Sequence, residues 1–457
     1  MIPRIVVAGT SSGAGKTTVA SGLIGALRAR GRTVQGFKVG PDYIDPSYHA
    51  LASGRPGRNL DAFLSGPQLI APLLRHGCAG ADVAVIEGVM GLFDGASGRG
   101  ELASTAHVAK LLDAPVLLVV DGAAMARSAA AVVHGFRSFD PELQIAGVVF
   151  NRVGSDHHAE LLEQAVAAVP GAPLPVLGAL SRDDRITAPE RHLGLTPVAE
   201  RREQAAAALD VSATVVAETV DLDRVMRLAG AAPPSAGPAW SPEADVAVSP
   251  CRIAVAGGPA FSFHYEENLE LLTAAGAELL PFDPTVAEAL PAGSDALVLA
   301  GGFPEVFGAE LSANETLRRE VAALAESGRP ILAECGGLLY LAEKLDGHAM
   351  CGVLPLRGRT GRRLTLGYRE ATVATATPWL AAGQALRGHE FHYSTVEPVD
   401  DRAVPPAWEL TARGRTRADG AATGSVQAGY LHVHWAAHPE AGHAFARAAA
   451  RAGVTWD

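Results

Sequence analysis

Short apolar runs alternate with segments of helical spacing through the first half of the chain. Five such runs predict strands, at residues 5–8, 34–37, 83–86, 116–120 and 145–150. Between them, segments such as 102–112 and 123–139 carry apolar residues at helical intervals. Continuous apolar strands separated by helices predict an α/β fold with a doubly wound parallel sheet, covered by helices on both faces. Because ligands bind at the carboxyl ends of such strands, the residues directly after each run are the candidate site.

A break in this pattern divides the chain. Residues 231–250 are rich in Pro, Ala and Ser and lack periodicity, which is typical of a linker. The expected domains are therefore residues 1–230 and residues 251–457. The second domain repeats the α/β pattern, with strands expected at 253–256, 278–280, 296–300 and 331–333 and helices near 267–275, 311–327 and 440–451. From residue 362 to the last helix, we expect short strands in a stretch rich in Thr, Tyr and His.

Composition narrows the class of protein. The 457 residues carry a net charge of -11 with no long basic run, which argues against nucleic acid as the main partner. The four cysteines include no Cys-x-x-Cys pair, so neither a disulfide framework nor a zinc ribbon is expected. The first strand begins too early for a signal peptide, and no apolar run reaches the roughly 18 residues of a membrane span. The sequence therefore predicts a soluble cytoplasmic protein that does not bind membranes.

A glycine-rich loop follows the first predicted strand. Residues 9–18 have the sequence GTSSGAGKTT and lead into a helical pattern, which is the layout of a phosphate-binding loop (P-loop). Its backbone amides and helix N-terminus would bind phosphate, and Lys16 would place a positive charge between the β- and γ-phosphates. The Thr17 hydroxyl would contact Mg²⁺. The residues expected to hold the nucleotide are Thr10, Ser11, Gly13, Ala14, Gly15, Lys16, Thr17 and Thr18.

Polar residues follow three other predicted strands. Lys38, Asp42 and Asp45 come after the second run. Asp42 could hold Mg²⁺ directly or through water, and Asp45 could face a substrate, with an ordinary polar turn as the alternative. Glu87 ends the third run and is the expected metal ligand, because an apolar strand that ends in a carboxylate is the second half of an NTPase site. Asn151 follows the fifth run, where its amide could recognise an adenine edge or simply be solvated.

Cys335 is the candidate nucleophile of the second domain. It lies between the strand expected at 331–333 and a helical pattern, with small residues two before it and two after it. This spacing predicts a strained elbow that exposes the sulfur, and a helix N-terminus that lowers the pKa of the thiol. Backbone amides of Gly302 and Gly336 could form an oxyanion hole. A buried core cysteine and an ordinary turn are the alternatives.

A histidine is the expected base for this thiol. The candidates are His389, His392, His432, His434 and His438. His432 and His434 are two residues apart and would share one face of a strand, so spacing alone does not choose between them. A zinc site built from these histidines is the rival interpretation, although they lack Cys partners and a His-Glu-x-x-His spacing.

Longer motifs resemble one enzyme family. GTSSGAGKTT, FKVGPDYIDP and EGVMGLFDG are similar to sequences of the cobyrinic/hydrogenobyrinic acid a,c-diamide synthases, whose N-terminal half resembles dethiobiotin synthetase. LAGGFPE, ECGG, GHEFHY and YLHVH resemble the triad-type, class I-like glutaminase (glutamine amidotransferase) domain that these synthases carry. The resemblance covers residues 4–195 and 252–439, and so nearly the whole chain.

The resemblance also implies roles for individual residues. Lys16 and the loop amides would bind ATP. Mg²⁺ would be organised by Thr17, Asp42 and Glu87, and the substrate site would contain Lys38, Tyr43, Asp45 and Asp94. The family's Tyr-x-His pattern selects His432 as the base. His434 stands where many glutaminases have an acidic residue, so the third member of the triad is left open.

These features together predict an ATP-dependent, glutamine-hydrolysing amide synthase. By resemblance, it would amidate the a and c acetate side chains of hydrogenobyrinic or cobyrinic acid through acyl phosphates in cobalamin biosynthesis, with ATP and Mg²⁺ as cofactors. L-glutamine and a tetrapyrrole polycarboxylate are the expected partners, and a homodimer is one expected assembly. The alternatives are a P-loop regulatory ATPase with an inert binding domain, a synthase for a nickel tetrapyrrole, and a metal-binding or corrinoid-carrier protein.

Overall fold

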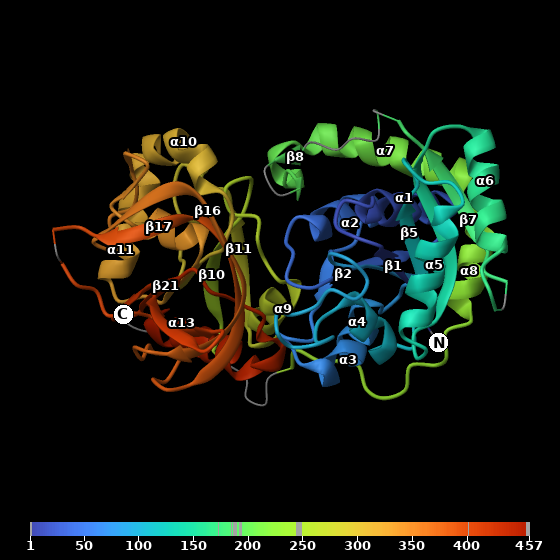
Figure 1. Ribbon diagram of the computed structural model, residues 1–457. Coiled ribbons are helices and arrows are strands. Elements are labelled where there is room, and N and C mark those ends of the chain that lie inside the picture. The colour runs from blue at the N-terminus through green and yellow to red at the C-terminus, as the bar shows by residue number, and fades with distance from the viewer. Residues whose placement is uncertain are drawn as a thin grey trace. The chain divides into compact units, whose positions relative to one another are not determined.

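The computed structural model describes residues 2–453 except 172, 184, 186–189, 192, 193, 244–248 and 401 (Figure 1). The chain forms two compact units, Met1–Ser241 and Pro242–Asp457, which are described separately. Part of the expected linker, residues 244–248, lies outside the described residues. Among the described residues, none of the helices has the length and apolar character that crossing a bilayer requires.

A seven-stranded parallel sheet forms the centre of the first unit. Its strands, in spatial order, are β3 (Arg58–Leu60), β2 (Val34–Val39), β4 (Val83–Glu87), β1 (Arg4–Gly9), β5 (Val116–Asp121), β6 (Ile145–Val153) and β7 (Val176–Ser181). All five strands expected from apolar runs are present, and nearly all of their residues are buried. The runs are continuous because helices shield both faces of a parallel sheet from water. A separate antiparallel pair is formed by β8 (Glu190–Arg191) and β9 (Gly194–Leu195).

Helices cover both faces of this sheet. They are α1 (Lys16–Ala29), α2 (Asp45–Ser53), α3 (Pro67–Gly77), α4 (Thr105–Leu111), α5 (Ser128–Phe139), α6 (Asp156–Ala167), α7 (Arg202–Thr219) and α8 (Leu222–Gly230). Figure 1 shows α1, α2 and α7 lying together, whereas α5 packs with α6 and α3 with α4. The chain leaves β1 toward β2 and leaves the adjacent β4 toward β5, in opposite directions across the sheet. The switch point of this doubly wound sheet, where ligands bind, therefore lies at the carboxyl ends of β1 and β4.

The first part of the expected linker packs against the first unit. The Arg75 guanidinium donates to the backbone oxygen of Pro238 at 2.7 Å. The Trp240 N–H donates to the backbone oxygen of Pro72 at 3.0 Å, and the Trp240 side chain is buried. These contacts attach the segment up to Trp240 to α3.

A six-stranded sheet forms the centre of the second unit. In spatial order its strands are β11 (Ala277–Phe282), β10 (Cys251–Ala256), β12 (Ala296–Leu299), β13 (Ile331–Glu334), β21 (Val426–Gly429) and β20 (Ala421–Thr423). All neighbours are parallel except β20 and β21. The helices are α9 (Glu266–Ala274), α10 (Gly308–Ala313), α11 (Glu315–Glu326), α12 (Gly336–Leu341) and α13 (Pro439–Gly453). One helix was expected at 311–327, but Asn314 divides it, because its side chain caps α11 by accepting the Leu317 N–H.

A second, mixed sheet contains long strands where the sequence analysis expected short ones. Its strands are β15 (His348–Ala349), β14 (Lys344–Leu345), β16 (Leu356–Val373), β17 (Ala385–Pro398) and β22 (His432–Val433), with β18 (Trp408–Ala412) and β19 (Arg415–Asp419) attached beside β16. The expectation was wrong because most of β16 is exposed or half-buried, so polar residues interrupt its apolar signal. Antiparallel pairing with β17 maintains the strand instead.

Two candidate active sites

The P-loop lies between β1 and α1, at the switch point of the first sheet. Gly13 and Gly15 have φ of 76° and 97°, in the left-handed region that favours glycine. A Cβ on Gly13 would meet nothing within 4 Å, so this side of the loop is open to a ligand. The Lys16 amine folds back over the loop and donates to the backbone oxygen of Ser11 at 3.0 Å. Burial, followed by the charge of Lys38, lowers the pKa of Lys16 to about 8.

Two residues at the end of β6 hold this loop from the side. The Asn151 amide nitrogen donates to the backbone oxygen of Ala14 at 3.1 Å. A Cβ on Gly15 would lie only 2.0 Å from that nitrogen, so the close approach requires glycine. The Arg152 guanidinium donates to the backbone oxygen of Gly13 at 2.9 Å. The structure therefore brings Asn151 to the P-loop, and its contact with a nucleotide stays a prediction.

Beside the loop lies a cluster of buried polar side chains. The Thr17 hydroxyl donates to Glu87 Oε1 at 2.6 Å and lies 3.5 Å from Asp45 Oδ2. The Lys38 amine contacts both carboxylates, at 2.8 Å from Glu87 and 2.6 Å from Asp45. His49 Nε2 lies 2.7 Å from the second Glu87 oxygen. The ends of β2 and β4 and the starts of α1 and α2 thus converge on one point.

Mutual charges set the protonation of this cluster. Burial lowers the pKa of Lys38, but Asp45 and Glu87 raise it by more, so the pKa is raised overall. Burial raises the pKa of Glu87, but Lys38 and the hydrogen bond to His49 lower it by more. Asp45 keeps a raised pKa, because burial and the charges of Asp42 and Glu87 outweigh Lys38. A divalent cation at the Thr17 hydroxyl would relieve the repulsion between Asp45 and Glu87, so these residues fit a Mg²⁺ site.

From the sequence, Asp42 was the candidate Mg²⁺ ligand and Asp45 the candidate substrate contact. In the structure, the two carboxylates have different partners. Asp42 Oδ1 accepts the backbone N–H groups of Ile44 at 2.7 Å and Asp45 at 3.1 Å, so this side chain starts α2. It is the Asp45 carboxylate that reaches Thr17 and Lys38. Asp42 Oδ1 thus stabilises the turn before Asp45, and the charge of Asp42 acts on Asp45 and Lys38.

The loop after β4 lies against the P-loop. A Cβ on Gly91 would lie 3.3 Å from the backbone oxygen of Thr10. Asp94 accepts the Gly91 N–H at 2.9 Å and is exposed, and its charge acts on Lys16. Tyr43, on the turn before α2, is buried. Asp94 is thus available to a ligand beside the nucleotide site.

Cys335 lies on a sharp turn between β13 and α12. Its φ of 49° and ψ of -98° give the strained elbow that the sequence predicts. Its N–H donates to the backbone oxygen of Gly429 at 2.7 Å, and its Sγ lies 3.6 Å from the backbone oxygen of Phe391. A Cβ on Gly336 would lie 3.1 Å from the Gly302 nitrogen, so the two candidate oxyanion-hole residues are adjacent.

Two expectations for Cys335 were wrong. The residue is 3% exposed, so the elbow does not present the sulfur to solvent. Burial, followed by the charge of Glu305, raises the pKa of the thiol and outweighs the hydrogen bond from the Gly336 amide. The short α12 therefore does not bring the pKa of this thiol below its usual value.

His432 is fully buried beside this turn. Its Nδ1 lies 3.3 Å from Glu334 Oε2. A Cβ on Gly301 would lie 2.3 Å from its Cε1, so the ring packs directly on the backbone of the Gly301–Gly302 turn. Because that turn also adjoins Gly336, the residue after Cys335, the candidate base and the candidate oxyanion-hole amides lie beside the turn that carries the candidate nucleophile.

The other candidate histidines face different partners. His434 Nε2 lies 3.4 Å from Glu267 Oε2 on α9. His389 pairs with His432 across β17 and β22, and burial, followed by the charge of His432, lowers its pKa to about 3. His392 stacks on a tyrosine ring. In the part of the chain that the structure describes, no group of three or more His, Cys, Asp or Glu side chains is placed to hold a metal ion.

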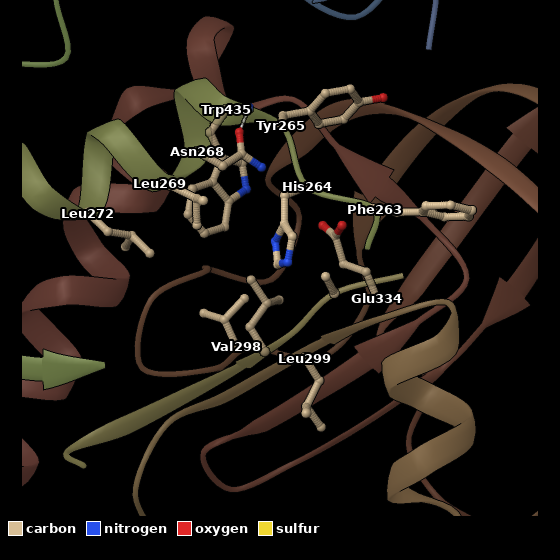
Figure 2. A pocket seen from close by; sticks show the side chains of 12 residues that line it. Phe263, His264, Tyr265, Asn268, Leu269, Leu272, Val298, Leu299, Glu334 and Trp435 are labelled. Atoms are coloured by element: carbon tan, nitrogen blue, oxygen red, sulfur yellow. Dashed lines mark hydrogen bonds between the residues drawn. The ribbon is translucent and has the colours of Figure 1, made fainter. Parts of the chain in front are cut away.

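Glu334 also lines a pocket of the second unit. Figure 2 shows Asn268 of α9, Val298 of β12 and Trp435 around it, with the Glu334 carboxylate beside the ring of His264. Burial lowers the pKa of His264, and its Nε2 lies 2.9 Å from a backbone oxygen of β10. Glu334 thus lines this pocket and also contacts His432.

Comparison with known proteins identifies both units. Residues 5–195 match the CobQ/CobB/MinD/ParA nucleotide binding domain, and residues 252–440 match the CobB/CobQ-like glutamine amidotransferase domain. A hydrogenobyrinate a,c-diamide synthase of Streptomyces coelicolor is 52% identical over 96% of both chains. Its namesake in Thermobifida fusca is 49% identical over 98% of this chain and 97% of its own. A cobyrinate a,c-diamide synthase of Syntrophotalea carbinolica is 45% identical over 97% of this chain and 98% of its own. The chain belongs to the a,c-diamide synthase family.

Three residues at the sites of this a,c-diamide synthase family member were not predicted from the sequence. His49 lies inside α2, where no spacing distinguishes it from a helix surface residue. Arg152 has a φ of 58°, and an arginine in a sequence gives no indication of this backbone conformation. Glu334 belongs to the ECGG motif, but its direction depends on the elbow that follows it. For Arg152 and Glu334, the one signal in the sequence was that each is a polar residue within three positions of a motif.

Replacing Gly301 by Ala is expected to inactivate the glutamine site of this family member selectively. The added Cβ would lie 2.3 Å from Cε1 and 3.2 Å from Nε2 of the buried His432 ring, so the ring must move. We expect the kcat of glutamate release to fall at least about 100-fold, because small misplacements of catalytic groups cost that much. Gly257→Ala is the control, since its Cβ would meet only a backbone oxygen at 3.8 Å. Normal glutamate release by Gly301→Ala would contradict this placement of His432.

Proposed function

We propose that this chain is a hydrogenobyrinate a,c-diamide synthase, which uses ATP and glutamine to convert the a and c acetate side chains of its substrate into amides. The observation that carries the proposal is the presence of two sites on one chain. One is a P-loop beside the Thr17–Glu87 cluster, and the other is the Cys335 elbow with His432. Residues 1–230 would activate the carboxylate and residues 251–457 would supply ammonia. The names of the relatives support the same division of labour.

The names of the relatives also favour the metal-free macrocycle as substrate. Relatives named for hydrogenobyrinate are 49–52% identical to this chain, whereas those named for cobyrinate are 41–45% identical. A polycarboxylate is compatible with a site that contains the amines of Lys16 and Lys38. We include a cytoplasmic location in the proposal, with neither nucleic acid nor membrane as a partner. A homodimer is also included, and light scattering of the purified chain tests it.

In the first site, the loop amides and Lys16 would hold the phosphates of ATP, and Asn151 would contact the nucleotide from the side. Thr17 and Glu87 would hold Mg²⁺ together with Asp45, while Asp42 orients Asp45 through the start of α2. Bound Mg²⁺ would neutralise charge on the β- and γ-phosphates. This assignment gives Asp45 the metal role that spacing suggested for Asp42.

The substrate carboxylate would attack the γ-phosphorus of ATP. An oxygen–phosphorus bond forms, the bond to ADP breaks, and an acyl phosphate results. Lys38, Tyr43 and Asp94 would line the substrate side, where the charge of Lys38 holds Asp45 and Glu87 in place. Activation is needed because an ionised carboxylate offers no leaving group, whereas an acyl phosphate can release phosphate.

In the second site, the Cys335 sulfur would attack the amide carbon of glutamine while His432 takes the thiol proton. Amides of Gly302 and Gly336 would donate to the oxygen of the tetrahedral intermediate. The intermediate releases NH₃, which takes the proton from His432, and leaves a glutamyl thioester. Water then hydrolyses the thioester to glutamate and restores the thiol.

Ammonia would complete the reaction at the first site. Its nitrogen attacks the carbonyl carbon of the acyl phosphate, inorganic phosphate leaves, and the nitrogen loses a proton to give the amide. Each amide therefore consumes one ATP and one glutamine. We assign the base to His432 and not to His434, because the ring of His432 packs on the turn that adjoins Cys335.

Product masses test the proposal. Purified protein is incubated with ATP, Mg²⁺, glutamine and hydrogenobyrinic acid, and the expected product is the diamide, with two ADP and two glutamate released per molecule. Parallel reactions contain cobyrinic acid, a nickel tetrapyrrole acid, or EDTA in place of Mg²⁺, and EDTA is expected to stop product formation. ATP hydrolysis without any amide product would favour the regulatory ATPase, and amidation of the nickel tetrapyrrole alone would favour that synthase.

A further inference from the structure

We propose that Glu334, the residue directly before the nucleophile, positions His432 and serves as the acidic third member of the glutaminase triad. The inference rests on the proposed function of the Cys335 site. It answers a question that the motifs leave open, because His434 occupies the place where an acidic residue was expected. Glu334 itself would make no contact with glutamine.

The Glu334 carboxylate contacts both the ring and the backbone of the strand that carries the base. Its Oε2 lies 3.3 Å from His432 Nδ1, and its Oε1 accepts the Val433 N–H at 3.3 Å. The Glu334 side chain is 14% exposed and that of His432 is fully buried. Two contacts from one carboxylate restrict the rotation of the imidazole as well as the position of β22.

Strand pairing determines where this carboxylate lies. β13 and β21 are parallel, with Glu334 opposite Gly429, and the Cys335 N–H donates to the Gly429 oxygen at 2.7 Å. Three residues after Gly429, the chain reaches His432 in β22. Because Glu334 and Cys335 are consecutive, one turn carries both the nucleophile and the carboxylate that orients its base.

The contact also determines which ring nitrogen can accept a proton. A carboxylate beside Nδ1 favours the tautomer with its hydrogen on Nδ1, so that Nε2 carries the lone pair. A Cβ on Gly301 would lie 3.2 Å from Nε2, so this nitrogen adjoins the turn of the candidate oxyanion hole. The carboxylate would also stabilise the imidazolium that forms when His432 takes the proton of the buried Cys335 thiol.

A second histidine–glutamate pair provides both the rival interpretation and the control. His434 lies 3.4 Å from Glu267, and both side chains are 1% exposed. His434 Nδ1 accepts the Ala436 N–H at the start of a 3₁₀ helix, and its ring lies 4.6 Å from the Tyr265 ring. These contacts indicate that His434 stabilises the chain before α13. Glu334, in contrast, directly precedes the nucleophile.

The test compares Glu334→Gln, Glu334→Asp and Glu267→Gln in the full chain. For Glu334→Gln, we expect the kcat of glutamate release to fall at least about 100-fold, since a triad acid replaced by its amide favours the wrong tautomer. The KM for glutamine is expected to stay close to the wild-type value, as is amidation with added ammonium. Glu334→Asp, which keeps a carboxylate, should recover part of the loss. Glu267→Gln should retain glutamate release.

Nitrogen NMR of protein labelled in its histidines reads the tautomer directly. The His432 signals are identified by their loss in His432→Gln, and they should show hydrogen on Nδ1 in wild type and a shift toward the Nε2 tautomer in Glu334→Gln. An unchanged tautomer, a loss carried by KM alone, or a larger loss in Glu267→Gln than in Glu334→Gln would overturn the inference. If the wild-type protein releases no glutamate, the proposed function fails instead, and the NMR result still decides whether Glu334 orients His432.

Discussion

Replacing Cys335 with Ala is expected to abolish glutamine-dependent amidation while amidation with added ammonium continues. The sulfur is the only atom of this site that forms a bond to glutamine in the proposed reaction, so the kcat of glutamate release should fall at least about 10³-fold. The ATP site lies in the other unit and does not use the thiol. Product masses and glutamate release, each measured with glutamine and with ammonium, separate the two half-reactions.

Cys351→Ala is the matched control for this experiment. Cys351 is buried in the same apolar core as Cys335, and burial also raises the pKa of its thiol. Cys351 does not directly precede a helix, and its backbone N–H donates to the backbone oxygen of Tyr340 within the core. If Cys351→Ala also loses glutamate release, the loss indicates damage to the core. Glutamine-dependent amidation by Cys335→Ala would refute the assigned nucleophile.

Much of the first unit could be predicted because its sheet is buried on both faces. Apolar residues must then be continuous, and the runs at 5–8 and 83–86 mark β1 and β4 together with the loops that leave them. The long β16–β17 pair has no comparable signal, since most residues of β16 are exposed or half-buried and the strand depends on pairing with β17. Sequence patterns predict elements whose burial is local, and they miss elements that pairing alone maintains.

The same distinction applies to the sites. The places of Lys16, Glu87 and Cys335 in the fold could be predicted, because each belongs to a motif that has a physical reason for its spacing. Lys16 begins α1 after the P-loop, Glu87 ends β4, and Cys335 directly follows β13. Which aspartate reaches Thr17 could not be predicted, because that depends on the turn in which Asp42 Oδ1 accepts two backbone N–H groups. The raised pKa of the Cys335 thiol was equally out of reach, since it follows from burial by segments far apart in the chain.

Replacing Lys38 with Met is expected to destroy the ATP-dependent half-reaction and to destabilise the first unit. Lys38 is 3% exposed and lies 2.8 Å from Glu87 and 2.6 Å from Asp45, so its removal leaves two carboxylates buried side by side. Loss of one partner of a buried ion pair costs about 3–5 kcal/mol of unfolding free energy. Urea unfolding of the full chain measures this, with the first unit identified as the transition that ATP shifts. Amidation should be lost with ammonium as well as with glutamine, while glutamate release survives.

Lys110→Met is the matched control, because the Lys110 amine also bridges carboxylates but does so near the surface, at 2.7 Å from Glu101, 2.8 Å from Asp140 and 3.6 Å from Glu142. Its loss should cost only about 0–1 kcal/mol. The double variant Lys38→Met, Glu87→Gln removes a charge of each sign and should be less destabilised than the sum of its single variants, because the charge that Lys38 neutralised is gone as well. Equal stability of the Lys38→Met and Lys110→Met proteins would show that water screens the cluster. In that case Asp45 and Glu87 would not need the amine to stay buried together.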